Sequence, residues 1–228
     1  GEFNGNQISN CSSSDGHFVH ASSGNQFNNN QLVECNVTNG HFVHFSSIIS
    51  FNYNTFYENN VNDSNNGNPN NDDNSDYCLI SLNVSDSLSF NSNVVNNNNY
   101  DDYLLKLSGQ NMNIVENIID LNTSANNSGA DDDEGPAIWL NSSGYNSSIK
   151  ENQITYTAAF KHGGSIYVYN ADSLVIQNNI LSHSSLSHSA SKGGGIYINN
   201  GLVDILNNTI TYNTSNEASG IFIDDDVV

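Results

Sequence analysis

Positive charge is scarce in this chain, because its 228 residues include four Lys and no Arg against 24 acidic residues, for a net charge of −20. Nucleic acids and anionic membrane surfaces bind proteins largely through Lys and Arg, so we expect neither as a partner. Long apolar runs are also lacking, so we expect no membrane insertion of this segment. No signal peptide is recognisable, which indicates a mature chain or a fragment.

What the chain has instead is Asn, about a fifth of all residues, in a repeated pattern. An apolar residue, two variable residues, an Asn, one variable residue and a second apolar residue recur every 24 to 39 residues. Units too short to bury a core of their own are typical of solenoids, in which each unit stacks on its neighbours. The repeated Asn should form a ladder: Asn6, Asn30, Asn54, Asn93, Asn117, Asn152, Asn178 and Asn208.

A second motif, an apolar–exposed–apolar triple, precedes each unit from the second onward. Alternation with a period of two residues predicts a strand with one buried face. We therefore predict one all-β domain over 1–228, a right-handed parallel β-helix of about eight coils with two or three sheets, the hand following from that of parallel crossovers. The triples lie at 19–21, 43–45, 80–82, 105–107, 138–140, 166–168, 196–198 and 221–223.

This register predicts an internal column next to the Asn ladder. The ladder Asn is expected at a sharp bend, because Asn tolerates the left-handed backbone region better than other non-Gly residues. Its amide could also bond to the Asn in the coils above and below. The first apolar residues of the units should stack inside: Phe3, Phe27, Phe51, Phe90, Ile114, Ile149, Val175 and Ile205.

The glycine-led strand Gly193–Ile198 and the Asn-Asn-Thr-Ile strand within Ile205–Ile210 resemble repeats of polymorphic outer membrane proteins and of Asn-rich adhesin-like surface proteins. The resemblance covers nearly the whole chain and is best from Gly163 to Ile223. It implies a parallel β-helix in an extracellular protein with an adhesive or structural role. It brings no catalytic residues to carry over.

Cys11 and Cys35 lie one 24-residue coil apart, each five residues after a ladder Asn. Stacked coils would place their Cα atoms inside the range for a disulfide. A disulfide would suit an oxidising extracellular setting, and the alternative is two reduced thiols in the wall. Cys78 has no equivalent partner and is expected to be buried.

The sequence Gly-His-Phe-Val-His occurs twice, at 16–20 and 40–44, and would stack His17 on His41 and His20 on His44. Four imidazoles in one patch could hold a metal ion. Two nearly identical coils would give the same pattern without any function, and we favour this alternative. Whether the protein binds a metal ion is left open.

Acidic clusters occur at 72–73, 101–102, 131–134 and 224–226, the first three at the corner where the coils differ in length. Ca²⁺ takes several oxygen ligands, so Ca²⁺ on this acidic loop edge is one interpretation. No calcium-loop spacing is present, and a solvated acidic edge without a cofactor is the favoured alternative.

Ten Asn-x-Ser/Thr sequons are candidate N-glycosylation sites and give mild support for an extracellular location. In a chain this rich in Asn, Ser and Thr, chance supplies several of them. They lie at Asn10, Asn36, Asn62, Asn83, Asn122, Asn126, Asn141, Asn146, Asn207 and Asn213.

Four aromatic residues, Trp139, Tyr167, Tyr197 and Phe222, occupy the outward middle position of successive triples. They should form an exposed ladder, and exposed aromatic stripes often mark a surface that binds glycans or a partner chain. The ordinary preference of aromatic residues for strands is the alternative explanation.

These features favour a non-enzymatic extracellular protein, structural or adhesin-like, that forms part of a cell-surface layer or a filamentous appendage and self-associates or stacks on neighbouring coils. The alternative is a carbohydrate-active β-helix that binds or cleaves polysaccharide, as pectate lyases and polygalacturonases do on this architecture. Their basic residues are missing here, since Arg is absent and Lys161-His162-Gly163 is only a faint counterpart of their motifs.

Neither end of the sequence carries a polar cap over its outermost coil. The chain opens inside a unit, at Phe3–Ile8, and closes after Ile221–Ile223 with an acidic run. Bare coils expose unpaired backbone groups. We therefore expect these residues to belong to a longer chain or to a subunit stacked end to end.

Overall fold

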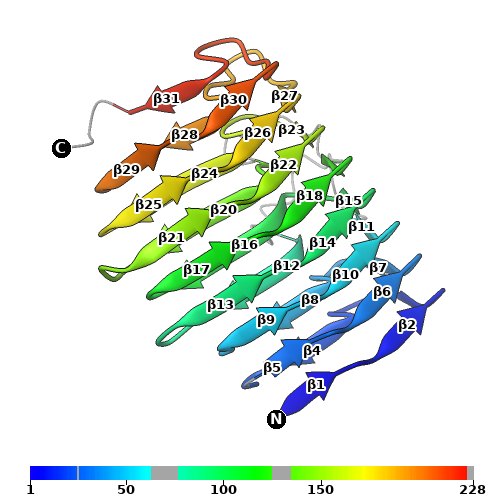
Figure 1. Ribbon diagram of the computed structural model, residues 1–228. Coiled ribbons are helices and arrows are strands. Elements are labelled where there is room, and N and C mark those ends of the chain that lie inside the picture. The colour runs from blue at the N-terminus through cyan, green and yellow to red at the C-terminus, as the bar shows by residue number, and fades with distance from the viewer. Residues whose placement is uncertain (25, 63–76, 125–134, 225–228) are drawn as a thin grey trace, which may run out of the picture.

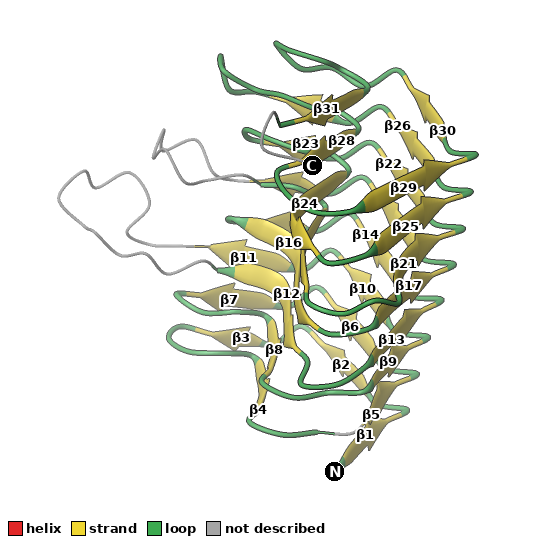
Figure 2. Cartoon of the chain, turned by 90° about the vertical axis from the view of Figure 1, so that its left-hand side faces the viewer, coloured by secondary structure: helices red, strands yellow, loops and turns green. Residues whose placement is uncertain are grey.

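The structure is a computed structural model that describes residues 1–24, 26–62, 77–124 and 135–224. These residues form a β-solenoid of about seven turns, in which every pairing between strands is parallel and no helix occurs. Each turn passes through four sheets, here named A to D, whose strands stack one above another (Figures 1 and 2). The predicted parallel β-solenoid is confirmed, but it has one sheet more than the sequence indicated.

Neighbouring strands of a sheet come from successive turns. Sheet A contains β1 (Glu2–Asn4), β5 (Gln26–Asn28), β9 (Ser50–Asn52), β13 (Leu88–Asn91), β17 (Met112–Val115), β21 (Ser147–Lys150), β25 (Leu174–Gln177) and β29 (Val203–Leu206). Sheet B contains β2 (Gln7–Ser9), β6 (Gln31–Val33), β10 (Thr55–Tyr57), β14 (Val94–Asn96), β18 (Ile118–Asp120), β22 (Gln153–Thr155), β26 (Ile180–Ser182) and β30 (Thr209–Thr211).

Sheet C is the wall that the sequence did not reveal, because most of its strands are only two residues long. It contains β3 (Ser12–Ser13), β7 (Asn36–Thr38), β11 (Asn60–Asn62), β15 (Asn99–Tyr100), β19 (Thr123–Ser124), β23 (Ala158–Ala159) and β27 (Ser185–Leu186). The predicted triples all lie in sheet D, which contains β4 (Val19–Ala21), β8 (Val43–Phe45), β12 (Cys78–Asn83), β16 (Tyr103–Gly109), β20 (Ile138–Ser142), β24 (Ile166–Ala171), β28 (Ile196–Ile198) and β31 (Ile221–Ile223).

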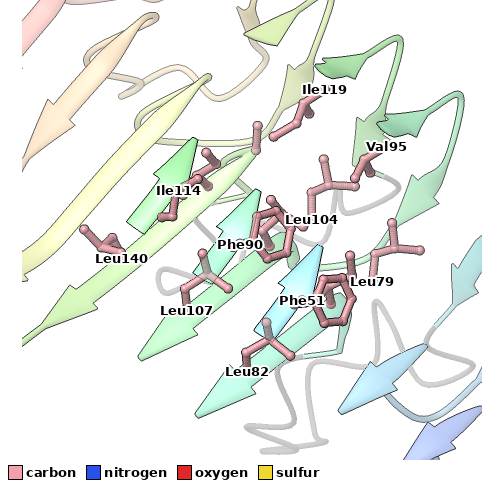
Figure 3. Packing of buried hydrophobic residues seen from close by; sticks show 14 of the residues in the cluster. Phe51, Leu79, Leu82, Phe90, Val95, Leu104, Leu107, Ile114, Ile119 and Leu140 are labelled. Carbon is pink, nitrogen blue, oxygen red and sulfur yellow. The ribbon is translucent and has the colours of Figure 1, made fainter. Parts of the chain in front are cut away.

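One hydrophobic core runs along the inside of the solenoid. Its predicted aromatic column is present, because the rings of Phe3, Phe27, Phe51 and Phe90 stack nearly parallel with successive centroid distances of 5.1, 4.9 and 5.1 Å. Figure 3 shows this column from Phe51 onward, with leucines of sheet D packed beside it. The spacing is that of stacked strands, so the rings follow the pairing of the backbone.

The seventh coil follows a register one residue away from the predicted one. The pattern fits twice there, starting at Val175 with Asn178 or at Ile176 with Asn179. The structure stacks Ile176 between the isoleucines of its neighbouring coils and buries Asn179. Val175 and Asn178 therefore do not belong to the predicted columns. Only the register of Ile176 and Asn179 stacks an apolar side chain on the apolar column and an amide on the Asn ladder.

The corrected ladder is unbroken at the corner between sheets A and B. Asn54 is typical: its Oδ1 accepts hydrogen bonds from N and Nδ2 of Asn30 at 3.0 and 3.1 Å, and its Nδ2 donates to the carbonyl of Phe27 and to Oδ1 of Asn93. A buried amide is tolerated when its donors and acceptors are satisfied. The ladder residues are Asn6, Asn30, Asn54, Asn93, Asn117, Asn152, Asn179 and Asn208.

The left-handed bend lies one residue earlier than the sequence interpretation placed it. No ladder Asn has a positive φ, whereas the residue before each one has a φ between 54° and 69°. Non-Gly residues are strained in this region, and the ladder bonds of the following residue hold the bend in place. The bend residues are Gly5, Asn29, Tyr53, Ser92, Glu116, Glu151, Asn178 and Asn207.

A second polar column, missed from the sequence, lies at the corner between sheets B and C. Its members follow the Asn ladder by five residues, and this constant offset was the available signal. In its middle, Oδ1 of Asn98 accepts hydrogen bonds from N and Nδ2 of Asn59, both at 3.0 Å. The second column consists of Cys11, Cys35, Asn59, Asn98, Asn122, Thr157, Ser184 and Asn213.

Cys11 and Cys35 begin the second column as free thiols, so of the two alternatives this structure has the reduced pair and not the disulfide. Sγ of Cys35 instead accepts the backbone N–H of Cys11 at 3.4 Å, in the position that an Asn oxygen takes in other coils. Burial raises the pKa of the Cys35 thiol. Cys78 is buried, as predicted.

Candidate functional site

The outward side chains at the centre of sheet D form one column along the solenoid, named here the outer D column. Its neighbours in each strand point into the core, as alternation in a strand requires. In-register pairing brings together side chains of different chemistry: His20, His44, Ser81, Lys106, Trp139, Tyr167, Tyr197 and Phe222. This column contains all four aromatic residues and two of the four histidines that the sequence marked as functional candidates.

The aromatic half of the outer D column has the predicted register but not the predicted exposure. Trp139, Tyr167 and Tyr197 are only 8, 5 and 5 % exposed, and Phe222 is half-buried. They form a second hydrophobic cluster together with Cys78 and Tyr103, outside the main core. The predicted exposure of the ladder is therefore wrong, whereas its binding of a glycan or a partner chain stays a prediction.

Other side chains cover these rings. Tyr169 stacks on Trp139 with a centroid distance of 5.3 Å, and His162 stacks on Tyr197 at 4.6 Å. Two lysines also lie over the cluster: Nζ of Lys106 is 5.2 Å from the Trp139 ring, and that of Lys192 lies over Phe222. Cation–π contacts of this kind stabilise a partly desolvated ammonium group. The aromatic half therefore stabilises the wall of the solenoid.

The rings of His17 and His41 lie next to the histidine half of the column, His20 and His44, and the four imidazoles form one compact stack. His17 lies on His41 at 5.0 Å and His20 on His44 at 5.3 Å, as predicted. The two pairs also stack on each other, with His17 4.9 Å from His20 and 5.1 Å from His44. Among the described residues, no group of three or more His, Cys, Asp or Glu side chains is placed to hold a metal ion.

Hydrogen bonds fix the protonation of two of these rings. Nδ1 of His17 accepts the backbone N–H of His41 at 3.1 Å, and Nδ1 of His41 accepts that of Cys78 at 3.1 Å. Each ring is therefore neutral with its proton on Nε2. Burial, followed by the nearby histidines and Lys106, lowers the pKa of His41 to about 3, and burial together with His20 lowers the pKa of His17.

The described part of the acidic edge is not solvated as predicted. Asp101 and Asp102 are 2 and 8 % exposed, and Oδ2 of Asp102 accepts the backbone N–H of Tyr77 at 2.8 Å. In the fourth acidic cluster, which was not assigned to this edge, Oδ2 of Asp224 accepts the hydroxyl of Tyr197 at 2.7 Å. The clusters at 72–73 and 131–134 lie outside the described residues, so the prediction about Ca²⁺ there stays a prediction.

Two of the candidate glycosylation sites are buried. Asn122 and Asn213 belong to the second column and are 0 and 8 % exposed, so a glycan there would break the column. Asn126 lies outside the described residues. The remaining sequons lie on exposed or half-buried positions: Asn10, Asn36, Asn62, Asn83, Asn141, Asn146 and Asn207.

The fold and these sites define a class, the parallel β-solenoid proteins with internal polar columns. No family model, curated protein or solved structure matches the chain. The resemblance to outer membrane and adhesin-like repeats thus depends on the sequence motifs alone. In the described part of the chain, no helix has the length and apolar character needed to cross a membrane.

Proposed function

We propose that this protein is a non-enzymatic extracellular β-solenoid, structural or adhesin-like, in a cell-surface layer or a filamentous appendage. The polymorphic outer membrane and adhesin-like repeats are the type of protein that it resembles. The proposal includes association with further copies or with neighbouring solenoid coils.

The observation that carries this proposal is the continuity of the Asn ladder and the core from the first coil to the last. At roughly 4.8 Å per coil, about seven turns give a rigid rod on the order of 30 Å long. The outer face of sheet A carries a regular array of hydrogen-bonded Asn side chains as well. Oδ1 of Asn28 accepts the backbone N–H of Asn52, and Oδ1 of Asn52 accepts the backbone N–H of Asn91, both at 2.8 Å. A repetitive rod suits a scaffold that presents a surface.

The test is the location of the native protein. An antibody against the folded chain should label intact cells as strongly as permeabilised ones, and electron microscopy should place the label on a surface layer or appendage. Labelling that needs permeabilisation would refute the extracellular role. Sedimentation of the purified chain over a range of concentrations tests self-association, which a monomer at all concentrations would contradict.

A further inference from the structure

A hollow of about 440 Å³ lies at the corner between sheets D and A, in the C-terminal half of the solenoid. Three successive turns contribute to it, those that follow β20, β24 and β28. The hollow is shallow and broadly open to solvent. Its lining residues are Tyr145, Asn170, Ala171, Asp172, Asn200, Gly201 and Leu202.

Two backbone irregularities shape this hollow. Between β20 and β24 the register shifts, so that Leu140 pairs with Val168 but Asn141 pairs with Asn170, which leaves Tyr169 as a bulge residue. β-Bulges re-aim side chains and are common beside binding sites. At the floor, Gly201 has a φ of 126°, and a Cβ there would lie 2.2 Å from the carbonyl oxygen of Ala171. Only glycine allows the two turns to approach so closely.

The lining combines apolar surface with hydrogen-bonding groups. The side chains of Tyr145 and Leu202 are 80 and 62 % exposed, so the hollow presents apolar surface directly to solvent. Nδ2 of Asn200 donates to Oδ1 of Asn170 at 2.9 Å, which turns the Asn170 amine and the Asn200 oxygen toward other partners. Asp172 uses Oδ2 to accept the N–H of Gly144, and its second oxygen is a further acceptor.

We propose that this hollow binds a sugar unit of a neutral polysaccharide. A pyranose presents C–H groups on one face, which pack on an aromatic ring such as Tyr145, and hydroxyls at its edge, which pair with amides and carboxylates. No lining residue is basic, and Asp172 together with the net charge of −20 repels anionic glycans. The inference rests on the proposed extracellular role, since that is where the protein would meet a polysaccharide.

The test measures binding of the full chain to immobilised neutral hexasaccharides of glucose, mannose, xylose and N-acetylglucosamine. We expect at least one to bind, and both Tyr145→Ala and Asp172→Ala to weaken that binding at least tenfold. Tyr145 is exposed, so its loss should leave the fold intact, which circular dichroism checks. Tyr53→Ala is the matched control, because Tyr53 is 63 % exposed at a distant corner, and its binding should stay within twofold of the wild type.

Binding of none of these probes, or equal binding by wild type and Tyr145→Ala, would overturn the inference. A protein that labels intact cells but binds no neutral glycan refutes the hollow as a site and leaves the surface role standing. A protein found only inside cells refutes the surface role itself. The two failures are therefore distinguishable.

Discussion

At the corner between sheets A and B all eight coils place an Asn, whereas the corner between sheets B and C holds Cys, Asn, Thr or Ser at the equivalent position. At both corners the residue before the column member has a left-handed backbone conformation. At both, the side chain of the column member is in position to accept a hydrogen bond from a backbone N–H of the preceding coil. Of these side chains only Asn combines this acceptor with two donors, whereas a hydroxyl has a single donor. In the described residues, Oγ1 of Thr157 is buried without a hydrogen-bond partner. The second column is therefore the weaker of the two.

The imidazole rings of His17 and His41 also accept hydrogen bonds from backbone N–H groups, but unlike the Asn amides they can be protonated. Their Nδ1 atoms accept backbone N–H groups from the following coil, whereas the amide oxygens of the Asn ladder accept from the preceding one. Amides keep their bonding pattern at any ordinary pH, but an imidazole loses its acceptor when it is protonated. The first coils are therefore the part of the solenoid where acid should act most directly.

The largest expected effect separates the two registers of the seventh coil. Asn179→Ala removes the acceptor of Asn152 N and the donor to the Ile149 carbonyl, both at 2.9 Å. Each buried group left unpaired costs about 1–3 kcal/mol, so we expect a loss of about 3 kcal/mol or more in the free energy of unfolding. Asn178→Ala is the control and should cost about 1 kcal/mol, because Ala is only strained at the bend. Urea unfolding measures both, and equal losses would contradict the register.

The next effect is a loss of stability in acid. Because the pKa of His41 is lowered in the folded state, the unfolded chain takes up its proton first, and stability should fall as the pH decreases from about 6.5 toward about 3. For His41 the loss at pH 5.5 should be roughly 1 kcal/mol. Burial is the main cause of the lowered pKa, and the positive charges of His44, His17 and Lys106 are smaller causes.

The matched variant for this test is the double substitution His17→Asn and His41→Asn, which keeps an acceptor that does not titrate. Urea unfolding of both proteins at pH 7.5 and 5.5 gives the difference, and carboxylates elsewhere cancel in the comparison. If the wild type loses no more stability than the double variant, the imidazole pair is not acid-sensitive in the way that its geometry indicates.

A smaller gain should follow from repairing the second column. Thr157→Asn places an amide between Asn122 and Ser184 and removes the buried hydroxyl that has no partner among the described residues. New hydrogen bonds of this kind contribute about 0.5–1.5 kcal/mol each, so we expect a gain of about 1 kcal/mol. Thermal and urea unfolding measure it, with Thr155→Asn on the neighbouring strand as control. A loss of stability would show that the corner is too narrow for an amide at this coil.

The smallest effect concerns the thiols that open the second column. Cys11 is exposed, whereas Cys35 and Cys78 are buried, so iodoacetamide should modify only Cys11 in the native protein. Stability should barely change, because the Cys11 thiol lies outside the core. Peptide mass spectrometry identifies the labelled residue, with urea-unfolded protein as the control in which all three react. Fast native labelling of Cys35 would show that the first coils open readily.

Much of the fold could be predicted because the repeat pattern is periodic and local. The Phe column, the triples of sheet D and seven of the eight ladder Asn follow from which residues recur at equivalent positions. The second column carried the same offset of five residues, but its mixture of Cys, Asn, Thr and Ser hid it. Sheet C was missed because most of its strands have only two residues and cannot show alternation.

The candidate sites could be predicted less well, because exposure depends on what packs over a strand. The outward position of Trp139 follows from the sequence, but its burial depends on Tyr169 and on Lys106 of the preceding coil. The hollow beside Asp172 depends on a register shift between two strands, which no local pattern announces.

By itself, the sequence determined the solenoid class and the inward-facing residues, since a repeated unit with fixed apolar positions can bury them only by stacking. Only the tertiary structure decided between Asn178 and Asn179, because both satisfy the local pattern and the choice depends on which one meets Asn152 and Asn208 across the coils. It also decided which aromatic rings are covered and which, like that of Tyr145, stay exposed. Those outcomes depend on contacts between residues some 30 positions apart, which in a parallel solenoid are set by the stacking of whole turns.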